Sequence, residues 1–223
     1  MYETRTLSRL FGEWGFGLHQ LTYHGIPMNS LYIFEGTDGV GKSTLVREIS
    51  HCLAKLGVKN HTLSFPGREE GTLGAHVYKL HHEPEHYGIS TMSALSRQIL
   101  HVAAHVDSIE RKILPLIEDG AIVLLDRYWW STWAYGVEGG VSTSLLDAIL
   151  EVEHQVWRGV VPATLFYVTR SQSKATAELC EAYETLIGRE SLKHPIERVD
   201  NNGGLSETTE VLVKKLLIQL NER

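Results

Sequence analysis

Apolar residues follow two patterns along this chain: short continuous runs, and longer segments with apolar positions every three or four residues. Continuous runs are typical of strands buried on both faces of a parallel sheet, and the spaced pattern is typical of amphipathic helices. The predicted strands are Leu31–Glu35, His61–Phe65, Ala121–Leu125, Thr164–Val168 and Ile196–Val199. The predicted helices are Lys42–Leu56, Thr72–Leu80, Thr91–Ile113 with an end at Pro115 and Gly120, Thr143–Trp157, Ala175–Ile187 and Glu207–Leu220.

This alternation predicts a three-layer α/β/α fold with a five-stranded parallel sheet, because right-handed crossovers place helices on both faces of the sheet. Residues 81–90 and the glycine- and tryptophan-rich residues 127–142 are expected to be loops. The length of 223 residues suits one domain, assigned to residues 28–223, after an N-terminal extension of unknown role, residues 1–27. Ligands of such sheets bind at the carboxyl ends of the strands, so the site is expected there.

A glycine-rich segment directly follows the first predicted strand. Gly36, Gly41, Lys42 and Ser43 match the phosphate-loop pattern G-x-x-x-x-G-K-[ST]. The glycines let backbone N–H groups curl around phosphate oxygens, the lysine reaches the β- and γ-phosphates, and the serine hydroxyl binds Mg²⁺. With a strand before it and a helix after it, the segment predicts a P-loop NTPase fold that binds a nucleoside triphosphate. The residues expected to hold it are Gly36, Thr37, Asp38, Gly39, Val40, Gly41, Lys42, Ser43 and Thr44.

Charged residues also gather at the ends of two other predicted strands. Asp126 ends the apolar run that begins at Ile122, the usual position of a carboxylate that holds Mg²⁺ beside the phosphate-loop serine. Arg127 follows it, and Arg68 lies after the neighbouring strand. Both guanidinium groups can clamp a phosphate with two hydrogen bonds, so the acceptor is expected to carry a phosphate itself. Phosphoryl transfer depends mainly on positioning and charge neutralisation, so this site needs no strong base.

Composition restricts the partners of the chain. The net charge is −6 and the basic residues are scattered, which argues against a nucleic-acid surface. Two cysteines, Cys52 and Cys180, are too few for a disulfide framework and suggest a cytoplasmic protein. No apolar run reaches the length of about 18 residues needed to cross a membrane. The twelve histidines lack the spacing of metal sites, so no metal beyond nucleotide-bound Mg²⁺ is expected.

Four segments resemble the thymidylate kinases. They read FEGTDGVGKST (34–44), FPGR (65–68), ERKILPLIEDG (110–120) and DRYWWSTWAYG (126–136), with a weaker match in AYETL (182–186) and RVDNNGGLSETTEVLVKKL (198–216). The resemblance implies that Lys42, Ser43 and Thr44 hold Mg²⁺ and the phosphates of ATP, with Asp126 supporting the metal. Lys42, Asp126, Arg127 and Asp38 would be the catalytic residues, and Asp38 would contact the 3′-hydroxyl of the acceptor sugar.

The same resemblance implies an acceptor site for a deoxynucleoside monophosphate. Arg68 and Arg127 would hold its phosphate, and Tyr135 would lie under the deoxyribose and exclude a 2′-hydroxyl. The residues implied around the acceptor are Asp38, Phe65, Arg68, His101, His105, Arg127, Ser131 and Tyr135.

The base-recognition positions depart from the family pattern. The family has an aromatic residue that stacks on thymine and, four residues later, an arginine that bonds its edge, and His101 and His105 occupy these positions here. Their spacing puts both on one helix face, so they can contact a base. A plain surface pair without function is one alternative, and a pair of metal ligands that lacks a third ligand is another.

Two further departures concern the lid and the residue after Tyr135. The family carries an arginine-bearing lid after its fourth strand, whereas residues 169–176 offer only Arg170 and Lys174. An arginine in the phosphate loop could supply the positive charge that a shortened lid lacks, but Gly39 and Val40 stand at those positions. Whether the site catalyses transfer efficiently is therefore an open question at this stage. Gly136 stands where the family often has a polar residue.

The predicted function is therefore ATP-dependent phosphorylation of a deoxynucleoside 5′-monophosphate to the diphosphate, with thymidylate as the default acceptor. One alternative is a kinase for a different or modified pyrimidine deoxynucleotide. The other is an ATP-binding regulatory or degenerate module with little transfer activity. The apolar stripe of the long helix exceeds what one sheet face requires, and because the family dimerises through such helices, a homodimer is expected.

Overall fold

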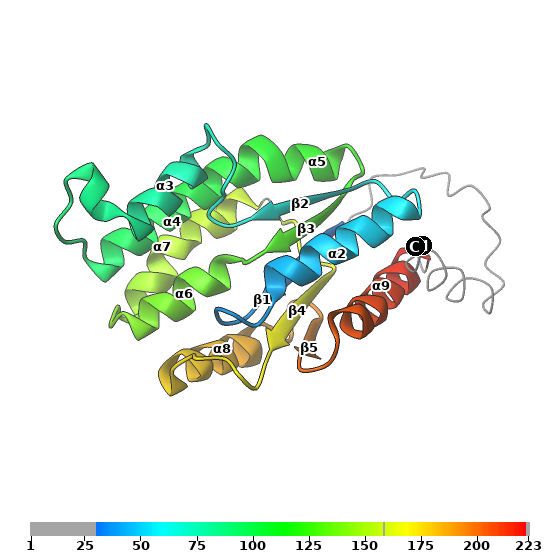
Figure 1. Cartoon of the computed structure of the whole chain (residues 1–223). Helices are drawn as coiled ribbons and strands as arrows, with labels where there is room; N and C mark the ends of the chain where they lie inside the picture. Colours follow the sequence, from blue (N-terminus) through cyan, green and yellow to red (C-terminus); the bar gives the residue numbers. More distant parts are fainter. Residues whose placement is uncertain (1–29, 158, 222–223) are drawn as a thin grey trace.

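The computed structural model describes residues 30–157 and 159–221. Within these residues, five parallel strands form one sheet with the order β2-β3-β1-β4-β5 (Figure 1). This confirms the predicted α/β fold and its five-stranded parallel sheet. The strands are β1 (Leu31–Glu35), β2 (Asn60–Ser64), β3 (Ile122–Asp126), β4 (Thr164–Thr169) and β5 (Ile196–Asp200).

The strand register places the functional residues at one edge of the sheet. Every residue of β1 and β3 is buried, as their continuous apolar runs predict. Phe34 of β1 pairs with Asp126 of β3, which also pairs with Ser64 of β2. The carboxyl ends of these three neighbouring strands therefore meet at the same level, and the loops that follow them face each other.

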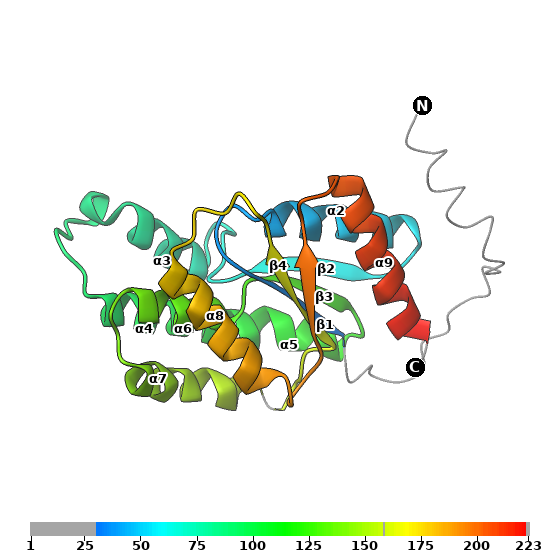
Figure 2. The ribbon, with the colours of Figure 1, turned by 90° about the horizontal axis from the view of Figure 1, so that it is seen from below.

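Helices cover the sheet on both faces, so the fold has three layers (Figure 2). Helices α2 and α9 lie side by side on one face, and α4 to α8 lie on the other. The long elements are α2 (Lys42–Lys55), α3 (Leu73–His82), α4 (Ala94–Ser108), α6 (Trp129–Glu138), α7 (Thr143–Val156), α8 (Ala177–Glu190) and α9 (Leu205–Asn221). A 3₁₀ turn, η1 (Pro84–Tyr87), lies within the predicted loop 81–90.

Alternate residues of the strands feed two separate hydrophobic cores. Tyr32 and Phe34 of β1 point to the core under α2 and α9, which also contains Leu45 and Leu216. Ile33, in contrast, belongs to the core under α4 to α8. Because a strand alternates its side chains between the two faces, a strand buried on both sides must be apolar throughout. The central position of β1 thus holds the phosphate loop that follows it on a rigid support.

The prediction of a loop over residues 127–142 was wrong in its first half, where α6 forms. Its glycines and tryptophans suggested irregular structure, but Trp129, Trp130, Trp133 and Ala134 are almost completely buried. These positions recur at helical spacing, and the indole rings pack against the sheet and α7. Burial of large aromatic surface outweighs the weak helix propensity of these residues.

The long apolar stripe ends just before Gly120, as the sequence predicted, but Pro115 does not close it. Helix α4 passes into a π-helical turn, η2 (Ile109–Ile113), and then into α5 (Leu114–Glu118). The wider turn keeps Ile109 and Ile113 fully buried. Pro115 lies in the first turn of α5, where its missing N–H needs no partner, so it continues the helical path rather than closing it.

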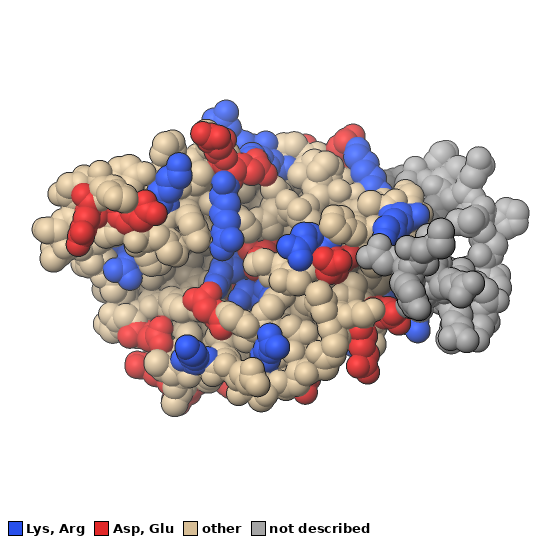
Figure 3. All heavy atoms as spheres, viewed as in Figure 1, with Lys and Arg blue, Asp and Glu red and all other residues tan. Residues whose placement is uncertain are grey.

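The predicted N-terminal extension, residues 1–27, lies outside the described residues. Among the described helices, none is long and apolar enough to cross a bilayer. Lys and Arg side chains are interspersed with Asp and Glu over the face shown in Figure 3.

Candidate active site

The loop between β1 and α2 is shaped by glycines that no other residue can replace. Gly36 has a φ of 137°, and a Cβ there would lie 2.2 Å from the carbonyl oxygen of Val168. Gly41, with a φ of 97°, ends the loop against Asn201, whose side-chain amide donates to the Val40 carbonyl at 2.7 Å. These contacts force the loop to curl tightly over the strand ends, as the motif requires.

Lys42 is folded back into this loop. Its ammonium group donates to the carbonyl oxygens of Gly36 and Thr37 at 2.9 and 2.8 Å, and the residue is only 5% exposed. Burial, helped by the nearby positive charge of Arg127, lowers the pKa of Lys42 to about 8. The group is thus still charged at neutral pH and is held beside the position where a triphosphate would lie.

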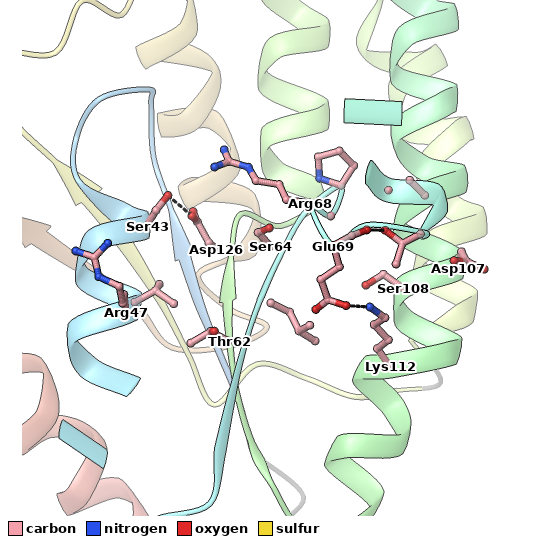
Figure 4. Close-up of a pocket in the computed structure, with 17 residues that line it drawn as sticks. Ser43, Arg47, Thr62, Ser64, Arg68, Glu69, Asp107, Ser108, Lys112 and Asp126 are labelled. Carbon is pink, nitrogen blue, oxygen red and sulfur yellow. Dashed lines mark hydrogen bonds and ion pairs between the residues drawn. The ribbon is translucent and has the colours of Figure 1, made fainter. Parts of the chain in front are cut away.

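Ser43 and Asp126 meet beside this lysine, and Figure 4 shows them facing each other from α2 and the end of β3. The serine hydroxyl donates to one carboxylate oxygen of Asp126. The other oxygen, Oδ1, is buried and has no hydrogen-bond partner among the described residues. A buried carboxylate oxygen without a partner is costly, and a hydroxyl beside it completes an oxygen donor pair of the kind that Mg²⁺ prefers. These two residues therefore fit the predicted magnesium site.

Arg127 connects the phosphate loop to α6. Its backbone adopts a φ of 74°, unusual for a residue with a side chain. The guanidinium donates to Ser131 at 2.8 Å and to Asp38 in the phosphate loop, and Asp38 also accepts from the Tyr135 hydroxyl at 2.8 Å. Partial burial raises the pKa of Asp38, but the charge of Arg127 and the tyrosine hydrogen bond outweigh it, so the net pKa is lowered. Four predicted site residues thus form one connected network.

Glu35, at the end of β1, is hydrogen-bonded to residues of this network, and the sequence analysis did not identify it. The carboxylate is fully buried and accepts from the backbone N–H groups of Tyr128 and Ser131 at 2.6 and 3.0 Å. It also accepts from the hydroxyls of Ser131 and Tyr183 at 2.9 and 3.1 Å. Burial raises the pKa of Glu35, although the charges of Arg127 and Lys42 oppose this. A carboxyl at the end of an otherwise apolar strand was the available signal, because such a group requires buried donors.

All eight residues predicted to contact the acceptor line a single cavity of about 280 Å³. Asp38, Arg127, Ser131 and Tyr135 lie toward the phosphate loop, through the network described above. Helix α3 adds Tyr78, His81 and His82, and Gln98 and Thr132 add further polar groups, none of which the sequence analysis identified. The Thr132 hydroxyl is buried and has no hydrogen-bond partner among the described residues.

Arg68 lies on the exposed loop after β2 and lines this cavity as well as a second one of about 340 Å³. Its guanidinium stacks over the Tyr78 ring at 4.8 Å and extends toward the Ser43–Asp126 pair (Figure 4). The second cavity continues from that pair to the ion pair between Glu69 and Lys112. Arg68 therefore stands between the predicted metal site and the predicted acceptor site.

The interpretation of His101 and His105 as a plain surface pair was wrong. His105 is 1% exposed, stacks on Phe65 with a ring separation of 3.9 Å, and contacts Glu153 at 2.9 Å. His101 is half-buried and shares a hydrogen bond of 2.9 Å with His81. No group of His, Cys, Asp and Glu residues in the described chain is arranged to hold a metal ion, so the structure offers no third ligand for this pair.

The connection between β4 and α8 is as short as the sequence analysis expected. Only residues 170–176 separate the two elements, and Arg170 and Lys174 are exposed. Ser173 shares a hydrogen bond of 2.8 Å with Thr37, which ties the connection to the phosphate loop. Gly136, the remaining departure, lies where α6 meets α7, since a Cβ there would come within 2.4 Å of Leu146.

The sequence model of the thymidylate kinase family matches residues 34–190, which include the phosphate loop, the acceptor cavity and α8. The chain belongs to the thymidylate kinase family. The thymidylate kinase of Chlorobaculum parvum is 31% identical over 174 residues, which cover 78% of this chain and 75% of that protein. The thymidylate kinase of Chlorobium phaeobacteroides is 31% identical over 139 residues, 62% of this chain and 59% of that protein.

The fold agrees with a solved thymidylate kinase structure. The crystal structure of the Ehrlichia chaffeensis thymidylate kinase aligns with a TM-score of 0.68 and 19% sequence identity. The alignment covers 83% of this chain and 97% of that one. Membership of the thymidylate kinase family thus rests on the sequence, and the three-layer fold is shared.

Proposed function

We propose that this protein transfers the γ-phosphoryl group of ATP to the 5′-phosphate of a deoxynucleoside monophosphate, with thymidylate as the default acceptor. The observation that carries the proposal is the single cavity that joins Arg127 and Tyr135 to the phosphate loop through Asp38. A protein that only bound ATP would not need an arginine and a carboxylate arranged for a second phosphate and its sugar. The names of the matched relatives support thymidylate as the acceptor.

In this mechanism each residue positions a phosphate or neutralises its charge. Backbone N–H groups of the phosphate loop and Lys42 hold the triphosphate, while Arg127 and Arg68 hold the acceptor phosphate. Asp38 and Tyr135, which are held together by one hydrogen bond, orient the sugar. Ser43 and Asp126 would hold Mg²⁺, which supplies charge neutralisation on the transferred phosphoryl group.

The first experiment is ADP release with ATP and Mg²⁺ against a panel of ribo- and deoxynucleoside monophosphates. We expect turnover with thymidylate, and lower kcat/KM for the ribonucleotide counterpart because Tyr135 crowds the 2′ position. Turnover with only another deoxypyrimidine monophosphate would change the proposed acceptor but leave the proposed reaction intact. ATP binding without turnover across the whole panel would overturn the proposal and favour an ATP-binding regulatory module.

We further propose that two copies of the chain associate through α4. Ile99 is 47% exposed, and Ala103, four residues later on the same helix face, is exposed as well. Charge on this face is expected to separate the copies, so Ile99→Glu should shift the mass in light scattering from a dimer to a monomer. Val152→Glu, at an apolar position on α7 that is 58% exposed, is the control that should leave the mass unchanged. A monomeric wild-type protein would contradict the proposal.

We also propose a cytoplasmic location, and the free thiols of Cys52 and Cys180 are compatible with a reducing compartment.

A further inference from the structure

The two arginines proposed for the acceptor phosphate are held in very different ways. Arg127 is fixed by hydrogen bonds to Ser131 and Asp38. Arg68 is exposed, and its guanidinium has no hydrogen-bond or ion-pair partner among the described residues. A long side chain without such partners samples many rotamers, and ordering it when a phosphate binds costs conformational entropy. A residue that restrains Arg68 before the ligand arrives would lower this cost.

The backbone on both sides of Arg68 is already fixed. Before it, Pro66 packs so closely on Gly74 of α3 that a Cβ on Gly74 would lie 1.9 Å from the Pro66 carbonyl oxygen. After it, the carboxylate of Glu69 pairs with Lys112 of η2 across the second cavity (Figure 4). The freedom that remains in this segment is therefore mainly that of the Arg68 side chain.

The ring of Tyr78 restrains this side chain. The central carbon of the Arg68 guanidinium lies over the ring, 4.8 Å from its centroid. This separation is within the range of about 6 Å over which a cation is attracted to an aromatic face. Tyr78 is half-buried on α3, and its ring also stacks on His82, one turn later, at 4.1 Å and an interplanar angle of 28°. The ring is thus a fixed support for the guanidinium.

This stacking suits a group that must still bind a phosphate. Figure 4 shows the Arg68 guanidinium extending toward the Ser43–Asp126 pair, and both Arg68 and Tyr78 line the acceptor cavity. An aromatic face attracts the cation without using its N–H groups, which lie in the guanidinium plane and remain free to donate to phosphate oxygens. A carboxylate in the position of the ring would occupy these donors instead.

We propose that Tyr78 is a positioning residue that holds the Arg68 guanidinium ready for the 5′-phosphate of the acceptor. It acts through Arg68, and it does so with its aromatic ring rather than its hydroxyl. Its contribution therefore concerns ligands that carry the phosphate and not the nucleoside without it. This inference rests on the proposed function and adds a residue to the phosphate-binding part of the same site.

Calorimetry with thymidylate and with thymidine, both without ATP, tests the inference. In Tyr78→Leu the Kd of thymidylate should rise about three- to fivefold, the size of an exposed cation–π contact, while the Kd of thymidine stays within about twofold. Tyr78→Phe keeps the ring and should bind both ligands like the wild type. Tyr78→Gln, a second variant without a ring, should match Tyr78→Leu. Tyr87→Leu, at a tyrosine of η1 that is 46% exposed, is the control that should change neither constant.

A double-mutant cycle with Arg68→Met separates action through Arg68 from a direct contact with the ligand. Adding Tyr78→Leu to Arg68→Met should weaken thymidylate binding by no more than about twofold further, because the stacked cation is already gone. Fully additive losses would show that Tyr78 acts independently of Arg68 and would overturn the inference. Equal losses for thymidine and thymidylate, or a Tyr78→Phe variant as weak as Tyr78→Leu, would overturn it as well.

Steady-state kinetics of the same variants separates this inference from the proposed function. A higher KM for thymidylate in Tyr78→Leu, with the KM for ATP unchanged, would support both. Thymidylate binding that depends on Tyr78, without turnover by any form of the protein, would refute the kinase proposal and support the inference. Turnover with a thymidylate KM that is independent of Tyr78 would support the kinase and refute the inference. Failure of the wild type to bind thymidylate would refute both.

Discussion

Replacing Lys42 with alanine is expected to lower kcat for phosphoryl transfer by roughly 10³-fold or more, because the ammonium neutralises charge on the transferred phosphates. The loss should appear chiefly in kcat. The folded state should survive the change, since alanine removes a buried cation and leaves the loop glycines in place. Coupled ADP release measures the rate, and thermal melting checks the fold.

Lys55→Ala is the matched control, because Lys55 is exposed in the last turn of the same helix. It should leave the rate unchanged. Since burial lowers the pKa of Lys42 to about 8, the ammonium loses its proton as pH rises through that value. We therefore expect kcat/KM for ATP to be highest below pH 8 and to fall above it. Wild-type rates in Lys42→Ala would remove the phosphate loop from the mechanism.

Removal of the Arg127 guanidinium is expected to have the second largest effect. Arg127→Ala should raise the KM for the acceptor and lower kcat, each by about 10²-fold, while ATP affinity changes by less than about threefold. The guanidinium holds Asp38 and lines the acceptor cavity, so its loss affects the acceptor's phosphate and sugar together. Steady-state kinetics with each substrate varied in turn gives both constants.

Because Arg127 has a positive φ, this experiment needs a control for backbone strain. A backbone at 74° is strained for alanine but relaxed for glycine, so Arg127→Gly separates loss of the guanidinium from strain. Both variants should show the same kinetic defect. Arg111→Ala removes an exposed arginine from η2 and should leave the kinetics unchanged. An equal loss of ATP affinity in the Arg127 variants would place Arg127 on the donor nucleotide instead.

Local patterns were sufficient to predict most of the fold. Strands β1 and β3 are continuous apolar runs because they are buried on both faces, and a run of this kind can be read without its neighbours. Helix α6 was missed because its tryptophans and glycines have weak helix propensity, and only packing against the sheet and α7 makes that segment helical. The π turn before α5 likewise follows from keeping Ile109 and Ile113 in the core.

For the site, residues tied to a contiguous motif were predictable and those tied to distant partners were not. The phosphate loop and the Asp126–Arg127 pair follow strand ends, so their positions come directly from the sheet. Glu35 ends β1 directly before the phosphate loop, yet its partners Ser131 and Tyr183 lie 96 and 148 residues further along the chain. No local sequence pattern predicts hydrogen bonds between residues so far apart.

The sequence by itself determined the sheet, the phosphate loop and the family, because each of these depends on patterns of residues that are close together along the chain. The tertiary structure alone decided which groups line the cavity predicted for the acceptor. It brought Glu153 to His105 across 48 positions, and it buried the Thr132 hydroxyl without a partner among the described residues. Buried polar groups are satisfied by whatever the fold places beside them, and that placement depends on how α4, α6 and α7 pack together.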